Sequence, residues 1–430
     1  MPSLSKPSIA APLEFAIDPP ARLAIIGAGP IGLEAALYAR FLGYDISVFE
    51  RGRICERLLP RRHLPTLINL GDLCSPLGIR AIMAQQEGYQ PLARDYQPTV
   101  GEWLDTYLLP LAATDLLADH IHQDNEVQAV GRAGFLRGEL ADDPDRGDYA
   151  LRVLIRDGQG NERIEEFDGL IDASGRPVPC FLGESGIPAV GELAARRSES
   201  ARWRHIPPDL AVGDREALRD QRIVIVGESL DAAMSLEAVR GLTERYPATR
   251  VWWITRRLIN DESPGPIEEP NSNFGDTFRQ LIREANALSH SPQGFELVDG
   301  TAIQAVQGTR DETGAAPWRL KLIGKHAGTL ECDYLFSNTG YRVDDRITRE
   351  LHVHRCPASD RIREDALDVT MNPTVTPAVG IGKVIAEPHY HILGEKRAGG
   401  VHGLPFTECL AQIRQLFAIL GDRASLDLYA

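Results

Sequence analysis

The chain has 430 residues, of which 43% are hydrophobic, so it can bury a large core and has the length of roughly two to three domains. Its formal net charge of -15 excludes nucleic acid and anionic membranes as main partners. No stretch approaches the ~18 apolar residues of a transmembrane helix. The six cysteines are widely scattered, as is typical of reduced thiols, so we expect a cytoplasmic protein.

Residues 1–20 contain five prolines and no long apolar segment. They predict a flexible N-terminal arm rather than a secretory signal. The first element after this arm is an apolar strand that runs into the turn GAGPIG, residues 27–32. A helix is predicted at 30–42 and a second strand at 46–49.

The spacing of the glycines in this turn is that of a dinucleotide-binding motif. Gly27 permits a tight turn, Gly29 lets a pyrophosphate approach the backbone, and Gly32 lets the helix lie close to the sheet. Pro30 and Ile31 begin the helix, whose free N–H groups favour a diphosphate.

Glu50 directly follows the second strand, eighteen residues after Gly32. Its carboxylate can accept hydrogen bonds from a ribose diol and would repel a 2′-phosphate. The motif therefore predicts a site for FAD or NAD rather than for NADP. The alternative is a βαβ unit that binds no ligand.

A turn-rich stretch follows, from residue 51 to 101. It is too long for a simple connection, so we predict that it covers a ligand. The elements predicted after it are a helix at 99–117, strands at 126–130, 136–140 and 149–155, and a buried strand within 168–172 that ends in the small-residue turn 173–175.

The pattern of strand, glycine turn and helix then recurs later in the chain, with fewer glycines. An apolar strand at 222–226 leads into Gly227, and a helix follows from Leu230 through about residue 239. Ser229 and Ala232 stand where the first motif has its second and third glycines.

The next strand, 250–254, ends on Arg256 and Arg257 instead of a carboxylate. Arginine at this place accommodates a 2′-phosphate. The second nucleotide is therefore predicted to be NADPH rather than NADH. A solvated cationic turn is the alternative.

The last part of the chain contains short strands at 301–335 and a small-residue turn at 336–341. An apolar strand at 391–393 is closed by Gly394. A final helix is predicted at 408–420, with Thr407 as its N-cap.

A Glu-ended nucleotide site, a later Arg-ended one and two small-residue turns make the chain resemble the flavoproteins with two dinucleotide-binding domains, over roughly residues 21–420. The resemblance implies an α/β fold with two Rossmann-like domains, the NAD(P)H domain being inserted in a discontinuous FAD domain. The implied division is an arm at 1–20, FAD-binding parts at 21–213 and 334–430, and an NAD(P)H-binding domain at 214–333.

The resemblance also implies which residues bind the cofactors. Val127 would offer its backbone to the adenine, and Glu395 would bind the ribityl chain. The full set is Gly27, Gly29, Pro30, Ile31, Gly32, Glu50, Arg51, Val127, Ser174, Gly175, Gly394, Glu395, Phe406 and Thr407 for FAD, Gly227, Ser229, Leu230, Arg256 and Arg257 for NADPH, and Gly340 at the second small-residue turn.

Within this superfamily, disulfide reductases need two thiols close together in sequence. The closest pair here, Cys55 and Cys74, is nineteen residues apart, so no dithiol relay is expected. The other large branch is the single-component flavin monooxygenases, in which NADPH reduces FAD and O₂ then forms a C4a-peroxyflavin. Their fingerprint places a histidine where this chain has His205, although the rest of that fingerprint is absent.

The resemblance therefore implies an FAD- and NADPH-dependent monooxygenase that oxygenates nitrogen or another heteroatom of a small metabolite with O₂. Asn69, Asp72 and Ser75 are catalytic candidates, because the loop after the first βαβ unit commonly reaches the flavin. His205 is the fourth, from its place in the fingerprint. Turn capping, and for His205 an ordinary loop position, are the alternatives. Residues 271–273 are further candidates for substrate or nicotinamide contact.

Two other functions stay open: a reductase or dehydrogenase that passes electrons directly to a substrate or carrier protein, and a non-enzymatic FAD-binding module. Alternation on a strand would place His352, His354 and Cys356 on one face, as metal ligands require. Surface histidines are the favoured interpretation, and no metal is predicted. A homo-oligomer is left open.

Overall fold

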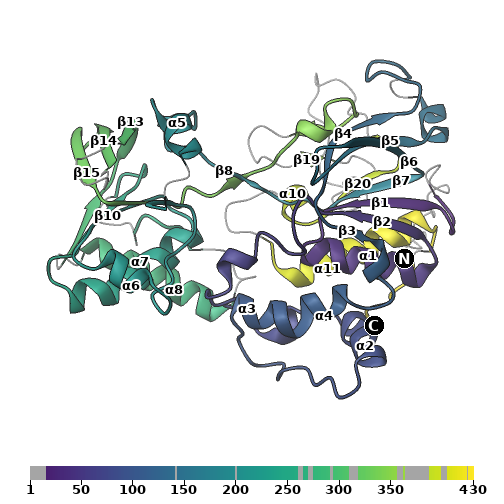
Figure 1. Ribbon diagram of the computed structural model, residues 1–430, viewed down its shortest axis with the longest axis horizontal. Helices are drawn as coiled ribbons and strands as arrows, with labels where there is room; N and C mark the ends of the chain where they lie inside the picture. Colours follow the sequence, from purple (N-terminus) through teal and green to yellow (C-terminus); the bar gives the residue numbers. More distant parts are fainter. Residues whose placement is uncertain are drawn as a thin grey trace, which may run out of the picture.

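The computed structural model describes residues 16–140, 143–198, 201–259, 265–269, 275–290, 294–308, 318–355, 362–363, 387–398, 404–423 and 425–430. They form two α/β units, and the chain passes from the first unit to the second and back (Figure 1). This order confirms the predicted fold class, in which the second Rossmann-like unit is inserted in the first.

The first unit is built on a five-stranded parallel sheet in the order β20-β7-β1-β2-β3. Its strands are β1 (Arg22–Ile26), β2 (Asp45–Phe49), β3 (Ile121–His122), β7 (Gly169–Asp172) and β20 (Tyr390–Ile392). Helices cover one face: α1 (Pro30–Leu42), α2 (Pro76–Gln85), α3 (Val100–Trp103), a π-helical segment (Leu104–Leu108), α4 (Leu109–Ala112) and α11 (Phe406–Leu420).

A three-stranded antiparallel sheet covers the opposite face; it consists of β4 (Asn125–Arg132), β5 (Leu151–Asp157) and β6 (Glu162–Phe167). Strand β1 shows how both faces are filled. Because successive side chains alternate, Leu23 and Ile25 pack among the helices, while Ala24 and Ile26 pack against the antiparallel sheet. β1 is therefore buried on both sides, as its continuous apolar run predicts.

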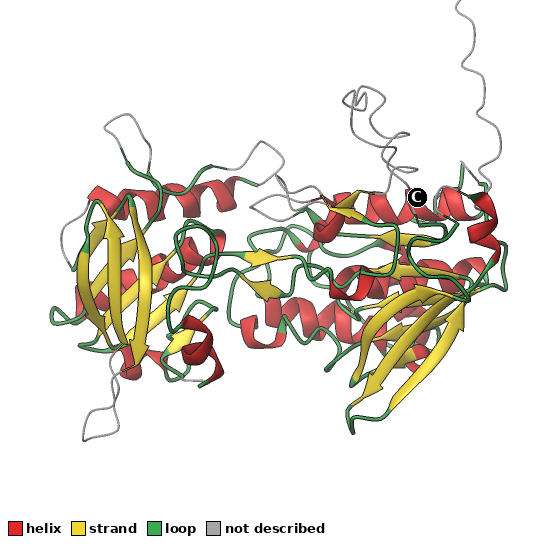
Figure 2. Cartoon of the chain, turned by 90° about the horizontal axis from the view of Figure 1, so that it is seen from above, coloured by secondary structure: helices red, strands yellow, loops and turns green. Residues whose placement is uncertain are grey.

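The second unit repeats this plan (Figure 2). Its parallel sheet has the order β12-β11-β10-β16-β9, and α7 and α8 cover one face. The antiparallel strands β13, β14 and β15 cover the other. The bounds are β9 (Trp203–Arg204), β10 (Arg222–Val226), α7 (Leu230–Arg245), β11 (Arg250–Ile254), α8 (Asp276–Ala287), β12 (Phe295–Val298), β13 (Thr301–Gly308), β14 (Trp318–Gly324), β15 (Gly328–Cys332) and β16 (Tyr334–Ser337).

The two chain crossings lie side by side as a short antiparallel ladder between β8 (Val178–Pro179) and β17 (Tyr341–Arg342). The remaining short elements are α5 (Glu192–Arg197), α6 (Asp214–Leu218), α10 (Glu395–Ala398), β18 (His354–Arg355) and β19 (Ile362–Arg363), and the 3₁₀ turns η1 (Leu59–Arg61), η2 (Leu70–Asp72), η4 (Ala118–His120), η5 (Pro144–Asp148), η6 (Leu288–His290) and η7 (Arg346–Thr348).

Sheet membership extends the second unit beyond the predicted range of 214–333. Strand β16 begins at Tyr334 and pairs with the central strand β10, while β9 pairs with β16 from the N-terminal side. The small-residue turn after β16 follows the last strand of the inserted unit. The β8–β17 ladder therefore lies at the passage between the units.

Several local predictions differ from the structure. The strand predicted at 136–140 is a series of turns, because no neighbouring strand pairs with it among the described residues. The helix predicted at 99–117 ends at Ala112 and contains the π-helical segment. The last helix starts at Phe406 with Pro405 as its N-cap, so Thr407 lies in the first turn and is not the cap.

The predicted arm at 1–20 is described only from residue 16 onward, where Ile17 N donates to Leu420 O (2.9 Å) and attaches the chain to the end of α11. None of the helices described here combines the length and apolar character that a membrane crossing requires.

Candidate functional site

A cavity of about 570 Å³ lies where the first and second units face each other. From the first unit it is lined by the GAGPIG turn, the residues after β2, and the turn after β7. From the second unit, Ser229, Leu230, Asp231 and Met234 of the α7 N-terminal part line it. The two sequence motifs therefore open into one cavity.

The N-terminus of α1 has the geometry of an anion site. Gly29 is its N-cap, no side chain caps this end, and Pro30 occupies the first turn, so backbone N–H groups at the cavity keep no capping partner among the described residues. A Cβ added to Gly29 would meet no protein atom within 4 Å, whereas one added to Gly32 would lie 1.8 Å from Gly27 O. Gly32 thus serves helix packing, and Gly29 keeps space open in the cavity.

Glu50 lies between the glycine turn and the end of β2. Its Oε2 accepts from Ala28 N (2.9 Å) and its Oε1 from Gly52 N (3.2 Å). These bonds hold the carboxylate at the cavity wall, where Arg51 and Val127 also lie. A ribose diol at this wall would find an acceptor of the required kind.

The turn after β7 is held by a buried polar cluster. Asp172 accepts from Ser174 Oγ (2.6 Å), Tyr390 OH (2.6 Å) and Lys396 Nζ (2.5 Å). Burial works to raise the pKa of Asp172, but the charge and hydrogen bond of Lys396 keep it below its ordinary value. The cluster positions Ser174 and Gly175 at the cavity.

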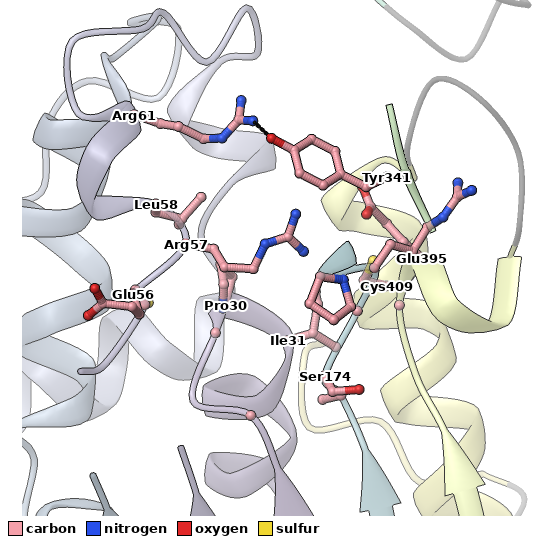
Figure 3. A pocket seen from close by; sticks show the side chains of 18 of the residues that line it. Pro30, Ile31, Glu56, Arg57, Leu58, Arg61, Ser174, Tyr341, Glu395 and Cys409 are labelled. Atoms are coloured by element: carbon pink, nitrogen blue, oxygen red, sulfur yellow. Dashed lines mark hydrogen bonds between the residues drawn. The ribbon is translucent and has the colours of Figure 1, made fainter. Parts of the chain in front are cut away.

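Two arginines that the sequence motifs do not identify project toward the cavity. Arg57 points into the space between Pro30 and Tyr341, and its guanidinium carbon lies 4.9 Å from the centroid of the Tyr341 ring (Figure 3). Arg57 is exposed to solvent at the cavity, but neighbouring protein atoms partly desolvate its guanidinium group. This desolvation lowers the pKa of Arg57, and the charge of Glu395 partly offsets the effect.

Arg61 crosses from the first unit to the second. Its Nη1 and Nη2 each lie 2.7 Å from a carboxylate oxygen of Asp231, and Nη2 also donates to Tyr341 OH (2.8 Å). Burial alone would lower the pKa of Arg61, but the hydrogen bonds and charge of Asp231 raise it. Both arginines lie in the stretch 51–101 predicted to cover a ligand, which is the signal that could have identified them.

The second glycine turn is supported from β16. A Cβ on Gly227 would lie 2.1 Å from Asn338 O, so the backbones are in direct contact. Ser229 is the N-cap of α7, and its Oγ donates to Asn338 O (2.6 Å). The serine thus caps the helix and holds the turn, two tasks that its first-motif counterpart Gly29 does not perform.

Arg256 and Arg257 are exposed after β11 and lie outside the cavity lining. The Arg257 guanidinium pairs with Glu268 (2.5 Å), and its backbone N donates to Glu228 Oε1 (2.8 Å). Both residues are exposed to solvent.

The structure does not bring the four catalytic candidates to the cavity. Asn69 and Asp72 are exposed around η2. Ser75 is fully buried and caps α2 by accepting from Gly78 N (2.8 Å). From this loop Ile68 and Leu73 line the cavity instead.

His205 lies beside the end of β16, where its Nδ1 is 3.2 Å from Ser337 O. Burial, and then the charge of Arg196, lower the pKa of its imidazole. It does not line the cavity. The 271–273 segment lies outside the described residues.

Most of the predicted cofactor residues meet at the cavity, and five do not. Those that line it are Gly27, Gly29, Pro30, Ile31, Glu50, Arg51, Val127, Ser174, Gly175, Ser229, Leu230, Gly340, Gly394, Glu395 and Phe406. Those outside it are Gly32, Gly227, Arg256, Arg257 and Thr407.

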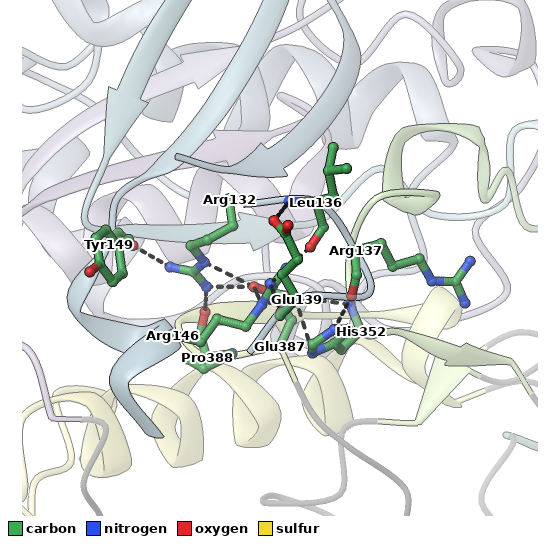
Figure 4. A network of polar contacts seen from close by, with 9 residues as sticks. All are labelled: Arg132, Leu136, Arg137, Glu139, Arg146, Tyr149, His352, Glu387 and Pro388. Atoms are coloured by element: carbon green, nitrogen blue, oxygen red, sulfur yellow. Dashed lines mark hydrogen bonds and ion pairs between the residues drawn. The ribbon is translucent and has the colours of Figure 1, made fainter. Parts of the chain in front are cut away.

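His352 belongs to a buried network of charged side chains (Figure 4). Its backbone N donates to Glu387 Oε2 (2.9 Å), and its Nε2 lies 2.5 Å from Arg137 O. Cys356 lies outside the described residues. Over the described ranges, no three His, Cys, Asp or Glu side chains are placed to hold a metal ion.

No protein-family model matches the sequence. Among solved structures, the chain is similar to the bacillithiol disulfide reductase Bdr (YpdA) from Bacillus cereus, with 17% identity, a TM-score of 0.62, and 94% of this chain and 99% of that chain covered. It is also similar to the FAD-bound cadaverine monooxygenase DfoA from Erwinia amylovora (14% identity, TM-score 0.59, 93% and 94% covered). The ornithine hydroxylase PvdA from Pseudomonas aeruginosa gives 15% identity, a TM-score of 0.55, and 94% and 100% covered.

These likenesses are to reductases and to oxygenases, and at such identities they show a shared fold. The chain has the fold of the flavoproteins with two dinucleotide-binding domains, so the resemblance expected from the two motifs is confirmed.

Proposed function

We propose that the protein is a flavoprotein oxidoreductase that uses FAD and oxidises NADPH. The observation that supports this most directly is the single cavity lined by both dinucleotide turns. Two dinucleotides bound at these turns would share one cavity, as hydride transfer between a nicotinamide and a flavin requires.

The residues at the first turn fit FAD. The uncapped N-terminus of α1 and the open space at Gly29 suit a diphosphate. Glu50 would bind the adenosine ribose, Glu395 the ribityl chain, and Arg51 and Arg57 would add positive charge near the diphosphate. When bound, the flavin supplies the redox chemistry, and the protein binds, orients and shields it.

NADPH is proposed for the second turn on the strength of Arg256 and Arg257. Their exposure leaves them accessible to a 2′-phosphate, and arginine is the residue best suited to bind one. Arg257 would exchange its exposed partner Glu268 for the phosphate. Such an exposed ion pair contributes only about 0–1 kcal/mol, so the exchange costs little.

The finer proposal is a monooxygenase that acts on a small metabolite with O₂. The 51–101 stretch contributes an apolar part of the cavity wall, which includes Ile68, Leu73 and Val100. An apolar wall excludes water from a reactive centre. Burial raises the pKa of the cavity-lining Cys55 thiol to about 12 and also raises that of Cys409, which disfavours the thiolates that a dithiol relay needs.

A reductase or dehydrogenase that passes electrons directly to a substrate or carrier is the second candidate. One observation favours it: the polar candidates for stabilising an oxygen adduct, Asn69, Asp72, Ser75 and His205, do not line the cavity. A non-enzymatic FAD-binding module is the third, favoured only by the replacement of two glycines in the second motif.

Anaerobic mixing of the FAD-loaded protein with NADPH tests the proposed oxidoreductase. Bleaching of the flavin absorbance is expected, and its absence with both NADPH and NADH would favour the non-enzymatic module. Oxygen is then admitted to the reduced protein. Rapid reoxidation through a transient absorbing species supports a monooxygenase, whereas a reduced flavin that is stable in O₂ supports the reductase.

A further inference from the structure

We infer that the diphosphate site of the second nucleotide is completed across the unit boundary by Arg61, which neutralises Asp231 in the first turn of α7. This inference rests on the proposed binding of NADPH to the second unit. It assigns a cofactor-positioning role to a residue that lies in the first unit and belongs to neither glycine motif.

The position of Asp231 is unusual for a diphosphate site. It is the second residue of α7, directly after Leu230, and it lines the cavity. In a Rossmann-type unit the diphosphate lies against this first turn, drawn by free N–H groups and the positive end of the helix dipole. A carboxylate here stabilises the empty helix but would repel two phosphates.

Arg61 removes that repulsion. Its guanidinium contacts both oxygens of Asp231 at 2.7 Å, and the side chains are only 17% and 13% exposed, respectively. A third segment also fixes the Arg61 guanidinium, because its Nη2 donates to Tyr341 OH at the β8–β17 ladder. A guanidinium has five N–H donors, so those not used by Asp231 and Tyr341 remain for an incoming phosphate.

A simpler role for the Arg61–Asp231 ion pair is to hold the two units together, and we call this role a tie. The two roles predict opposite effects of removing Asp231. If Arg61 serves only as a tie, loss of either partner breaks it, and both losses should have equal effects. If Arg61 neutralises Asp231, loss of the arginine leaves a bare carboxylate facing the diphosphate, whereas loss of the aspartate leaves an arginine that favours it.

The test measures NADP⁺ binding to the full-length, FAD-loaded protein by titration calorimetry. Arg61→Gln is expected to weaken NADP⁺ binding by about tenfold or more, and Asp231→Asn to leave it equal or tighter. The double variant should bind NADP⁺ more tightly than Arg61→Gln, because the bare carboxylate is gone. Arg62→Gln is the matched control, since the neighbouring Arg62 pairs with Asp105 on the exposed surface.

Adenosine 2′-monophosphate, which carries no diphosphate, should bind all variants equally, and this also shows that the second unit is folded. Arg61→Lys, which keeps the charge, should retain most of the affinity. Wild-type-like NADP⁺ binding by Arg61→Gln would overturn the inference. Equal losses in both single variants and the double variant would also overturn it, in favour of a tie. Failure of the wild-type protein to bind NADP⁺ would contradict the proposed function instead.

Discussion

Asp172 and Lys396 form an ion pair that solvent does not reach, with Lys396 Nζ 2.5 Å from Asp172 Oδ2 and both side chains fully buried. Asp172 is the last residue of β7, which precedes the inserted unit in the sequence. Lys396 lies in α10, which follows that unit and comes just after β20. Because β7 and β20 are neighbours in the sheet, the pair joins the two separated parts of the first unit at the edge that lines the cavity.

Replacement of Lys396 by Met should therefore lower the free energy of unfolding by about 3–5 kcal/mol, since it leaves the Asp172 charge buried without its partner. The double variant Asp172→Asn with Lys396→Met should recover much of this loss. Denaturant unfolding measures both. The exposed pair of Arg319 with Glu331 is the control, and Arg319→Met should cost only about 0–1 kcal/mol. Equal losses from Lys396→Met and Arg319→Met would contradict the argument.

Gly29 and Gly32 should separate cofactor binding from folding. Gly29→Ala adds a methyl group that meets no protein atom within 4 Å, so we expect unchanged stability of the apoprotein and a large loss of FAD affinity. Gly32→Ala places its methyl group 1.8 Å from Gly27 O, which should destabilise the apoprotein itself.

Thermal unfolding of the apoprotein and FAD titration by flavin fluorescence measure these two effects independently. If Gly29→Ala binds FAD as tightly as the wild-type protein, then the space at Gly29 is not where the diphosphate lies.

The parts of the fold that could be predicted are those with a strong local pattern. Apolar strand, glycine turn and Pro30 together fix the start of α1, and its predicted end at Leu42 matches the structure because Gly43 adopts a left-handed conformation there. The same pattern of an apolar strand followed by a glycine turn predicts β10 and the start of α7 correctly. The predicted end of α7, near residue 239, is too early, because the helix continues to Arg245.

The cavity wall between the two motifs could not be predicted in the same way. Nothing local in the 51–101 stretch determines which face of a turn points inward. The sequence therefore does not distinguish a catalytic Ser75 from one whose hydroxyl caps α2, as it does in the structure. Arg61 is held by Asp231, 170 residues away, and by Tyr341, 280 residues away. Contacts of this separation leave no trace in the local sequence.

The buried network around Glu387 predicts which of two substitutions destabilises the protein more. Glu387 pairs with Arg132 (2.7 Å) and Arg146 (3.0 Å), and the three side chains are at most 1% exposed (Figure 4). Burial works to raise the pKa of Glu387, but hydrogen bonds from Arg146 and the charge of Arg132 keep it below its ordinary value. One carboxylate thus balances two guanidinium groups.

Glu387→Gln should lower the free energy of unfolding by about 3–5 kcal/mol, because it leaves two buried cations without an anion. Arg146→Met should cost less, since Arg132 and Glu387 remain a neutral pair. Urea unfolding of the two variants gives the order. A greater loss for Arg146→Met would show that its hydrogen bond to Glu139 O (2.8 Å) matters more than the charge balance.

Glu34 should make the stability of the protein depend on pH near neutrality. It lies in α1 and is fully buried, and the hydroxyl of Tyr107 donates to its Oε1. Burial raises the pKa of Glu34 from 4.5 to about 7, with hydrogen bonds from Tyr107 and Ser75 partly offsetting the shift. The folded protein therefore holds a proton here that the unfolded chain releases above pH 4.5.

Stability from this proton is fully present below pH 4.5 and is lost as the pH rises through about 7. At about 1.4 kcal/mol for each unit of pKa shift, the loss should amount to about 3 kcal/mol. Glu34→Gln, which resembles the protonated acid, should remove this slope. His389, whose pKa burial lowers to about 4, contributes stability that is lost as the pH falls, a slope of opposite sign. Both proteins contain His389, so the difference between their unfolding free energies at pH 5 and pH 8 isolates Glu34, and a difference that is the same at both values would contradict the prediction.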